Sequence, residues 1–108
     1  MEQLAVTELQ VRCAVEAPLL LDVREPWEVA LAAIHLPGVQ AMNIPMGEIP
    51  SRLAELPPTQ AIVCICHHGV RSLQVAAFLE RQGFETVCNL AGGIDAWSMQ
   101  VDPNVPRY

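Results

Sequence analysis

A cysteine that opens a short polar segment is the residue of this sequence best placed to do chemistry. The segment reads Cys66-His67-His68-Gly69-Val70-Arg71 and follows the apolar run 61–65. Where a buried strand ends just before a helix, the first backbone N–H groups of the helix are unpaired and its dipole is positive. A thiol at such a place ionises readily, and the thiolate is the reactive nucleophile. We therefore predict that Cys66 is the catalytic residue of an enzyme.

The residues that follow Cys66 are the predicted substrate-binding residues. His67, His68 and Arg71 bring positive charge to an acidic chain, and Gly69 lets the loop turn with a positive φ. Together with the backbone of Val70, they are expected to surround an anion with inward-facing amides. The alternative for both histidines is a surface position without a role.

The elements around this loop alternate between strands and helices. We expect strands at residues 19–21, 41–45, 61–65 and 86–90, after a short apolar start at 4–6. Helices are expected at 7–14 with a capping box at Thr7, at 26–32, at 72–82 with Gly83 as a left-handed cap, and at 94–99. Residues 46–56 are helix-like. The alternation predicts an α/β fold of three layers, in which a mostly parallel central sheet of about five strands has helices on both faces. Ligands of such folds bind at the carboxyl ends of the strands, where Cys66 lies.

Several residues have predicted structural roles. Asp22 and Arg24 follow a buried strand and are expected to form a polar network. Arg71 could pair with a carboxylate such as Glu28 instead of binding substrate, or could do both.

The large and sulfur-containing apolar residues are expected in the core. Trp27 and Trp97 are predicted packing anchors, and Cys13, Cys64 and Cys88 are predicted to be buried free thiols that pack as small hydrophobes.

Length, charge and hydropathy limit the domain organisation and the partners. A chain of 108 residues predicts one domain, assigned to residues 1–100, with a proline-containing tail at 101–108. The net charge is −6 with six scattered arginines and no lysine, so no nucleic-acid partner is expected.

The longest apolar runs, 29–34 and 61–66, are far shorter than the roughly 20 residues of a membrane span, so no membrane partner is expected. Met1-Glu2-Gln3 lacks the basic start of an export signal, which together with free thiols predicts a cytoplasmic location.

Three motifs in order give the chain a family resemblance. The segment from Cys66 to Ser72 is similar to the active-site loop of the rhodanese family of single-domain sulfurtransferases. Asp22-Val23-Arg24-Glu25-Pro26 resembles the N-terminal signature of that family, and residues 90–97 resemble its C-terminal signature. The resemblance covers residues 4–98. One departure lies at His35, where the glycine that usually precedes the histidine is replaced by Ile34 and the following span is longer.

The resemblance implies a sulfur-transfer reaction without a cofactor or a metal. Cys66 would take sulfane sulfur from thiosulfate or a persulfide, carry it as a persulfide and pass it to cyanide, a small thiol or a protein thiol. Arg71 and His68 would hold the anionic donor. An alternative is a relay carrier that exchanges sulfur with partner proteins and has little activity on thiosulfate.

The cysteines also allow three other functions: an oxyanion enzyme, a metal site and a redox pair. Cysteine phosphatases and arsenate reductases place five residues between cysteine and arginine, whereas four separate Cys66 from Arg71, which favours a smaller anion. A metal site at Cys64-x-Cys66-His67-His68 is disfavoured because strand alternation turns Cys64 into a helix layer. A resolving role for Cys64 or Cys88 remains a further alternative.

Overall fold

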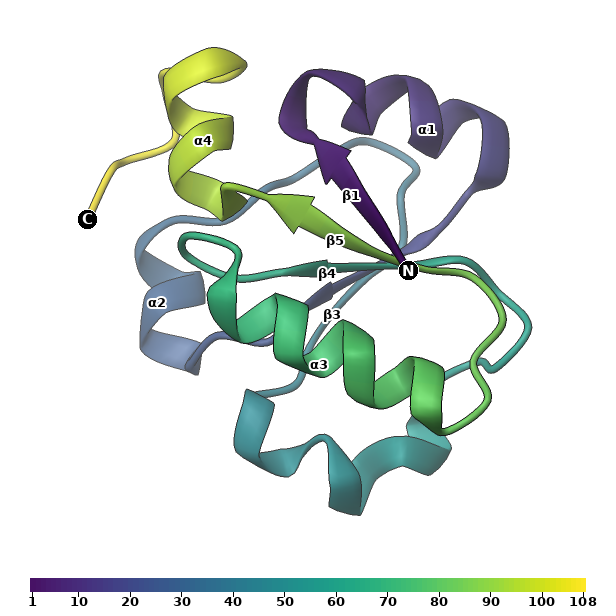
Figure 1. Cartoon of the computed structure of the whole chain (residues 1–108). Coiled ribbons are helices and arrows are strands. Elements are labelled where there is room, and N and C mark those ends of the chain that lie inside the picture. The colour runs from purple at the N-terminus through teal and green to yellow at the C-terminus, as the bar shows by residue number, and fades with distance from the viewer.

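Five parallel strands form one sheet in the computed structural model, which describes residues 1–108 (Figure 1). The strands are β1 (Glu2–Ala5), β2 (Leu19–Asp22), β3 (Ala41–Asn43), β4 (Ile62–Ile65) and β5 (Val87–Ala91). Their order across the sheet is β1-β5-β4-β2-β3, and every neighbouring pair is parallel. This arrangement confirms the α/β fold with a parallel central sheet.

Helices cover both faces of this sheet. They are α1 (Leu9–Glu16), α2 (Pro26–Leu31), α3 (Val70–Arg81) and α4 (Gly93–Gln100), with 3-10 segments at Val6–Glu8, Met46–Glu48 and Pro50–Glu55. Figure 1 shows α1 and α4 on one side of the sheet, with α3 and the two later 3-10 segments on the other. None of the helices combines the length and apolar composition needed to cross a bilayer.

The core consists of two apolar clusters, one on each face of the sheet. Leu20, Val63 and Leu90 belong to the cluster beneath α1 and α4, while Leu21 and Cys64 belong to the cluster beneath α3. Because successive strand residues point to opposite faces and both faces are covered, the central strands are apolar at nearly every position.

The two tryptophans differ from each other. Trp97 is 3% exposed and packs in the first cluster, as predicted. The prediction for Trp27 is wrong, since its side chain is 64% exposed. The short helix α2 turns Glu28 inward instead, and the Trp27 ring meets only the edge of the Tyr108 ring, at a centroid distance of 6.3 Å.

Three local predictions need correction. Thr7 does not cap a helix, because residues 6–8 form a 3-10 turn and α1 begins at Leu9 without a side-chain cap. The helix-like segment 46–56 is two 3-10 segments with a kink at Arg52, where φ is −114°. Helix α3 begins two residues earlier than predicted, directly after Gly69.

Residues 101–108 pack against the rest of the chain. The Val105 side chain is 9% exposed and lies in the first core cluster, and the Ser98 hydroxyl donates to the Val105 carbonyl. The Arg107 guanidinium pairs with Asp95 at 3.0 Å. The division of the chain at residue 100 stays a prediction, but the tail is anchored at several points.

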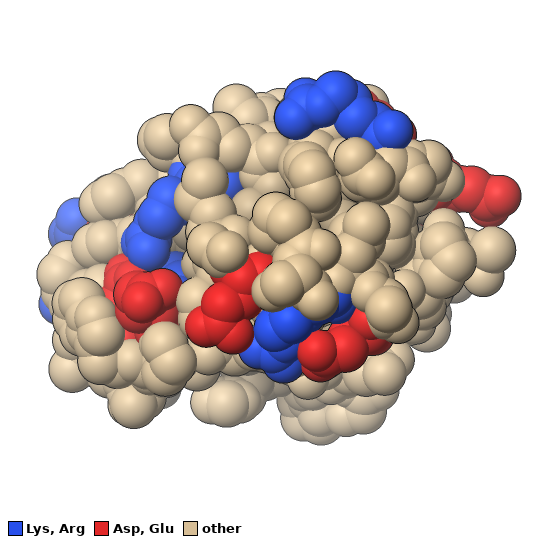
Figure 2. All heavy atoms as spheres, turned by 90° about the horizontal axis from the view of Figure 1, so that it is seen from below, with Lys and Arg blue, Asp and Glu red and all other residues tan.

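Positive charges are mostly neutralised by neighbouring carboxylates. Arg52, for example, pairs with Glu48 at 3.1 Å and with Glu55 at 2.8 Å. On the face shown in Figure 2, arginine and acidic side chains lie interspersed. No broad basic field is present on this face.

Candidate active site

Cys66 lies where β4 ends, and the loop that follows it is held in place by the start of α4. The carbonyls of Cys66 and His67 accept hydrogen bonds from the amides of Ile94 at 2.9 Å and Asp95 at 3.0 Å. Gly93 makes this contact possible: a Cβ on this residue would lie 2.4 Å from the Cys66 oxygen and 2.5 Å from the His67 oxygen. The loop therefore packs on α4 at a spacing that only glycine allows.

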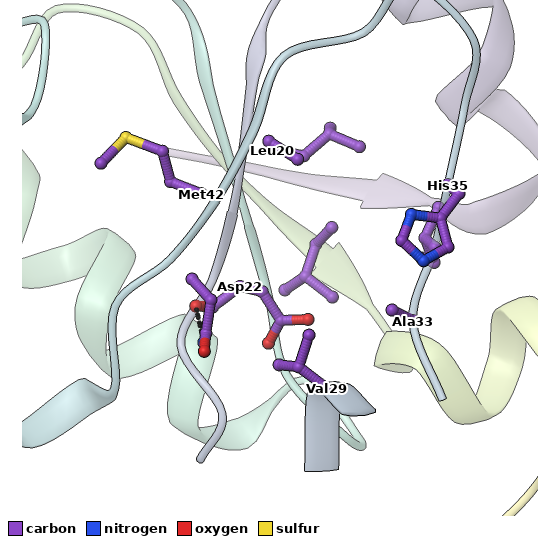
Figure 3. A pocket seen from close by; sticks show the side chains of 10 residues that line it. Leu20, Asp22, Val29, Ala33, His35 and Met42 are labelled. Atoms are coloured by element: carbon purple, nitrogen blue, oxygen red, sulfur yellow. Dashed lines mark hydrogen bonds between the residues drawn. The ribbon is translucent and has the colours of Figure 1, made fainter. Parts of the chain in front are cut away.

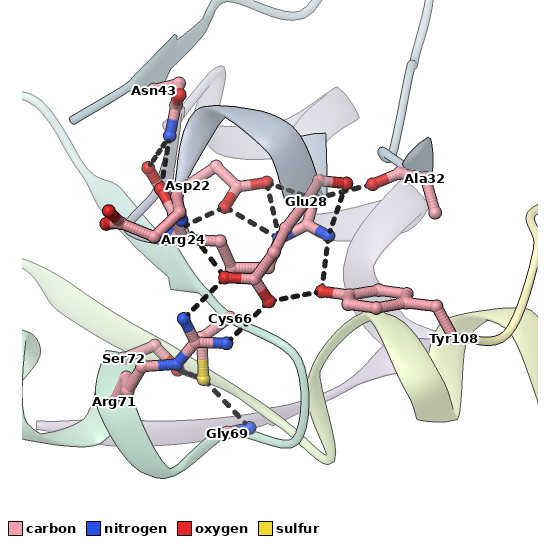
Figure 4. A network of polar contacts seen from close by, with 11 residues as sticks. Asp22, Arg24, Glu28, Ala32, Asn43, Cys66, Gly69, Arg71, Ser72 and Tyr108 are labelled. Atoms are coloured by element: carbon pink, nitrogen blue, oxygen red, sulfur yellow. Dashed lines mark hydrogen bonds and ion pairs between the residues drawn. The ribbon is translucent and has the colours of Figure 1, made fainter. Parts of the chain in front are cut away.

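The Cys66 sulfur accepts one backbone hydrogen bond and contacts one hydroxyl. The Gly69 amide donates to Sγ at 3.1 Å, and Ser72 Oγ lies 3.2 Å from Sγ (Figure 4). Gly69 has the predicted positive φ, +94°, and the chain enters α3 directly after it. One expectation is not met: a single amide, rather than several, is bonded to the sulfur.

The Cys66 side chain is buried in this structure. The residue is only 1% exposed, because Gly69 and the first turn of α3 close over it. The sulfur is therefore almost closed off from solvent in this structure.

Arg71 forms an ion pair with Glu28, which was the alternative considered for it. Its two terminal nitrogens donate to the two carboxylate oxygens at 2.7 and 2.9 Å. The hydrogen bonds from Arg71 lower the pKa of the buried Glu28 carboxyl to about 2. The positive charge of Arg71 is thus compensated in this structure.

A polar network also fixes the position of the Glu28 carboxylate. The Tyr108 hydroxyl donates to Glu28 Oε2 at 2.8 Å and accepts from Arg24 at 2.8 Å (Figure 4). Arg24 is fully buried, and it also donates to Asp22 at 2.6 Å and to the Ala32 carbonyl at 2.7 Å. The predicted structural role of Asp22 and Arg24 is confirmed.

The two histidines of the loop are stacked on each other and on the tail. The centroid of the His67 ring lies 3.9 Å from that of the Tyr108 ring, with an interplanar angle of 5°. It lies 3.9 Å from the centroid of the His68 ring, with an interplanar angle of 25°. Burial lowers the pKa of His67, so this imidazole is neutral at neutral pH and adds no charge for an anion. His68 is 61% exposed and lies 3.8 Å from the Asp95 carboxylate. The strongly positive loop expected from the residue types is therefore largely balanced by Glu28 and Asp95.

Comparison with known proteins identifies the family of this chain. The Rhodanese-like domain family matches residues 5–100. The chain belongs to this family. A sulfurtransferase of Allochromatium vinosum is 42% identical over 83 residues, which cover 77% of this chain and 74% of that protein. The putative sulfurtransferase YtwF of Bacillus subtilis is 43% identical over 84 residues, covering 78% and 77%. These relatives support a sulfurtransferase role for this rhodanese-like domain.

Solved structures and longer relatives complete the comparison. A rhodanese-related protein from Thermoplasma volcanium superposes with a TM-score of 0.81 at 28% identity, covering 94% of each chain. The human single-domain sulfurtransferase TSTD1 has a TM-score of 0.75 at 25% identity, covering 93% of this chain and 97% of that one. In contrast, this chain spans only 30% of the chloroplastic Rhodanese-like/PpiC domain-containing protein 12 of Arabidopsis thaliana, with 41% identity over 93 residues.

Metal ligation by this rhodanese-like domain is disfavoured by the arrangement of its loop. His67, His68 and Asp95 have ligand atoms within 4.8 Å of one another. However, the two imidazole planes are stacked, so an ion in the plane of one ring would lie out of the plane of the other. Arg107 also already binds Asp95.

The other cysteines are buried away from solvent. Cys64 is fully buried on the α3 face, where burial raises its pKa to about 12. Cys88 lies in the cluster on the opposite face of the sheet from Cys66. Cys13 is also buried, and all four cysteines are free thiols.

A cavity of about 200 Å³ lies apart from the Cys66 loop, between β2, β3 and the segment that carries His35 (Figure 3). Leu20, Val29 and Met42 give it a mostly apolar lining, and the carboxylate of Asp22 in its wall is bound by Arg24. Cys66 does not line this cavity, so it is not part of the site.

Sequence reasoning missed several residues that support the site. Ser72 was included only as the last residue of the loop motif and Gly93 only within the C-terminal signature, and no contact with Cys66 was predicted for either residue. Asn89 is a polar residue in an otherwise apolar strand, which was a usable signal. Nothing in the local sequence connects Tyr108 with residues 80 positions earlier.

Proposed function

We propose that this protein is a persulfide-forming sulfurtransferase whose nucleophile is Cys66 and whose donor is thiosulfate or a persulfide. The observation that carries the proposal is the position of Cys66 Sγ at the carboxyl end of β4, with the Gly69 amide donating to it at 3.1 Å. An N–H donor aimed at sulfur stabilises negative charge there, as an oxyanion hole does on oxygen. A cytoplasmic, reducing environment would keep the four cysteines as thiols.

The proposed reaction has two steps. The Cys66 thiolate attacks the outer sulfur of thiosulfate, a new S–S bond forms, and sulfite leaves with the electron pair of the bond that breaks. The acceptor, cyanide or a thiolate, then attacks the terminal sulfur of the persulfide, and the electron pair of the S–S bond returns to Cys66 Sγ. Neither step needs an oxidant, a cofactor or a metal.

Substrate binding is assigned to the loop. The backbone of His67, His68, Gly69 and Val70 would surround the donor, with the charge of Arg71 behind it. The side chain of Arg71 is 36% exposed, so it can approach an anion while Glu28 holds its other side.

A thiosulfate–cyanide assay tests the proposal. Cys66→Ala should abolish thiocyanate formation, while Cys13→Ala, which removes a buried thiol outside the site, should retain it. Mass spectrometry after incubation with thiosulfate should show a gain of about 32 Da, one sulfur atom, on Cys66. Equal thiocyanate production by the wild type and Cys66→Ala would overturn the proposal.

A second candidate function is a sulfur relay between proteins. The putative sulfur carrier protein YrkF of Bacillus subtilis is 42% identical to this chain over 79 residues, which are 40% of that protein. Trp27 and Val70, which are adjacent in sequence to Glu28 and Arg71, are 64% and 66% exposed and would offer apolar side chains to a partner protein. Persulfide on Cys66 from a protein donor, but not from thiosulfate, would favour the relay.

Phosphatase or arsenate reductase activity is a less favoured alternative. The loop has four residues between Cys66 and Arg71, and Arg71 is already held by a carboxylate. Sustained hydrolysis of p-nitrophenyl phosphate that depends on Cys66 would reverse this ranking.

A further inference from the structure

A buried chain of hydrogen bonds leads from the Cys66 sulfur to β5. Ser72 Oγ lies 3.2 Å from Cys66 Sγ and 2.5 Å from Asn89 Oδ1. Asn89 Nδ2 donates to the Gly69 carbonyl at 3.1 Å and to Gln3 Oε1 at 2.9 Å. Ser72 is fully buried and Asn89 is 2% exposed, so water does not compete for these bonds. Gln3 and Asn89 lie opposite each other in the register of β1 and β5, which fixes the amide in place.

The direction of each bond in this chain follows from the partners. A backbone carbonyl can only accept, so the group of Asn89 that faces Gly69 is the NH2 group. The group that faces Ser72 is therefore the Asn89 carbonyl oxygen, which has no hydrogen to give. The single hydroxyl hydrogen of Ser72 must then point at Asn89, and the Ser72 oxygen presents a lone pair to the Cys66 sulfur.

This direction suits the protonated form of the sulfur. A thiol S–H can donate to the lone pair of Ser72, whereas a thiolate facing the same lone pair is not stabilised by it. When the thiol proton leaves to solvent, the Ser72 hydroxyl can rotate and donate to the sulfur. That rotation breaks the hydrogen bond from Ser72 to Asn89, so part of the stabilisation of the thiolate is offset.

We propose that Asn89 is a positioning residue that sets how readily Cys66 ionises, by competing with the sulfur for the Ser72 hydrogen. When Cys66 is a thiol, the Ser72 hydroxyl donates to Asn89 Oδ1. When Cys66 is a thiolate, the Ser72 hydroxyl donates to Cys66 Sγ instead. This inference rests on Cys66 being the nucleophile, as proposed above, but not on the identity of the sulfur donor.

The charged and titratable groups of the surrounding elements stay the same in the test. They are Arg71 of α3 with Glu28 of α2, His67 and His68 of the loop, Asp95 of α4, Cys64 of β4 and Tyr108 of the tail. Asn89 is neutral, so replacing it with a neutral residue changes the Ser72 hydrogen bond without changing any charge.

The test is the pH dependence of Cys66 alkylation by iodoacetamide, followed by peptide mass spectrometry. Asn89→Leu should lower the midpoint of this profile by about 0.5–1 pH unit, because the Ser72 hydroxyl is then free to donate to the thiolate. In a Ser72→Ala background the same substitution should have a clearly smaller effect, because only the loss of the Asn89–Gly69 bond then remains. No shift in Asn89→Leu, or an equal shift in both backgrounds, would overturn the proposal.

A second substitution keeps the test decisive if Asn89→Leu does not fold. Asn89→Asp is isosteric and holds the Ser72 hydrogen more strongly, so it should raise the midpoint, and by more with Ser72 present than in Ser72→Ala. An equal rise in both backgrounds would reduce the effect to simple charge repulsion and contradict the proposal. Alkylation needs no sulfur donor, so failure of thiosulfate turnover would count against the proposed function and leave the result for Asn89 intact.

Discussion

Arg71 and Glu28 are joined by two parallel hydrogen bonds, 2.7 and 2.9 Å long, that tie the first turn of α3 to α2. The pair links the Cys66 loop to the polar network of the N-terminal half, across 43 residues of sequence. A bidentate pair of this kind has a defined geometry as well as a favourable energy. It therefore both orients Arg71 and limits how much of its charge is available to a substrate.

Replacing Glu28 should make the protein less stable, and the loss should depend on pH. Glu28→Gln is expected to lower the free energy of unfolding at pH 7 by about 1–2 kcal/mol, because the ion pair with Arg71 is lost. The loss is limited because the partly exposed Arg71 guanidinium regains water. Arg71 lowers the folded-state pKa of Glu28 from 4.5 to about 2. The stabilisation is thus fully present above pH 4.5 and is lost as the pH falls toward 2.

Urea unfolding of the wild type and Glu28→Gln at pH 7 and pH 3 measures this effect. Glu55→Gln is the matched control, because it breaks an exposed pair with Arg52 and should cost much less than Glu28→Gln. A difference between wild type and Glu28→Gln that grows on acidification would contradict the prediction.

Substitutions at Tyr108 should separate its hydroxyl from its ring. Tyr108→Phe is expected to cost about 1–2 kcal/mol, because the buried Arg24 and Glu28 each lose a partner. Tyr108→Ala also removes the stacking on His67 and should raise the pKa of His67, since burial is what lowers it. Titration of the histidine ring protons by NMR measures the shift. Tyr108→Phe keeps the ring, so an equal change in both variants would show that the stacking does not matter.

Gly93 should be far less tolerant of a side chain than another glycine of similar φ. Gly93→Ala places a Cβ within 2.4 Å of the Cys66 carbonyl, in addition to the strain of a φ of +61°. We expect a loss of about 2–4 kcal/mol in thermal or urea unfolding. Gly38→Ala is the control, with a φ of +74° and no atom within 4 Å of the added Cβ, and should cost about 1 kcal/mol. Equal losses would mean that the contact with the loop contributes nothing.

Mild oxidation should not produce an intramolecular disulfide at Cys66. Cys88 lies on the opposite face of the sheet, and Cys64 is fully buried with its pKa raised to about 12 by burial. Neither can supply a thiolate to Cys66. Intact-mass and peptide analysis after diamide treatment provides the measurement. A Cys64–Cys66 or Cys66–Cys88 peptide pair would restore the resolving-cysteine alternative.

Much of the fold could be predicted because its signals are local. The apolar strand 62–65, the amphipathic helix after it and the turn at Gly83 each follow from neighbouring residues. Helix starts and short 3-10 segments were predicted poorly. Their boundaries depend on small differences in backbone hydrogen bonding, as at Thr7, whose side chain makes no cap bond.

By itself, the sequence determined the parallel α/β fold and the place of Cys66 after β4, because strand and helix patterns and a strand-to-helix turn are set by residues close together in the chain. Only the tertiary structure decided which charges remain available and how the sulfur is covered. Glu28 meets Arg71, Tyr108 meets His67, and Asn89 meets Ser72 only after the elements pack. These side chains are far apart in sequence, and their hydrogen bonds and burial depend on the folded arrangement of the whole sheet.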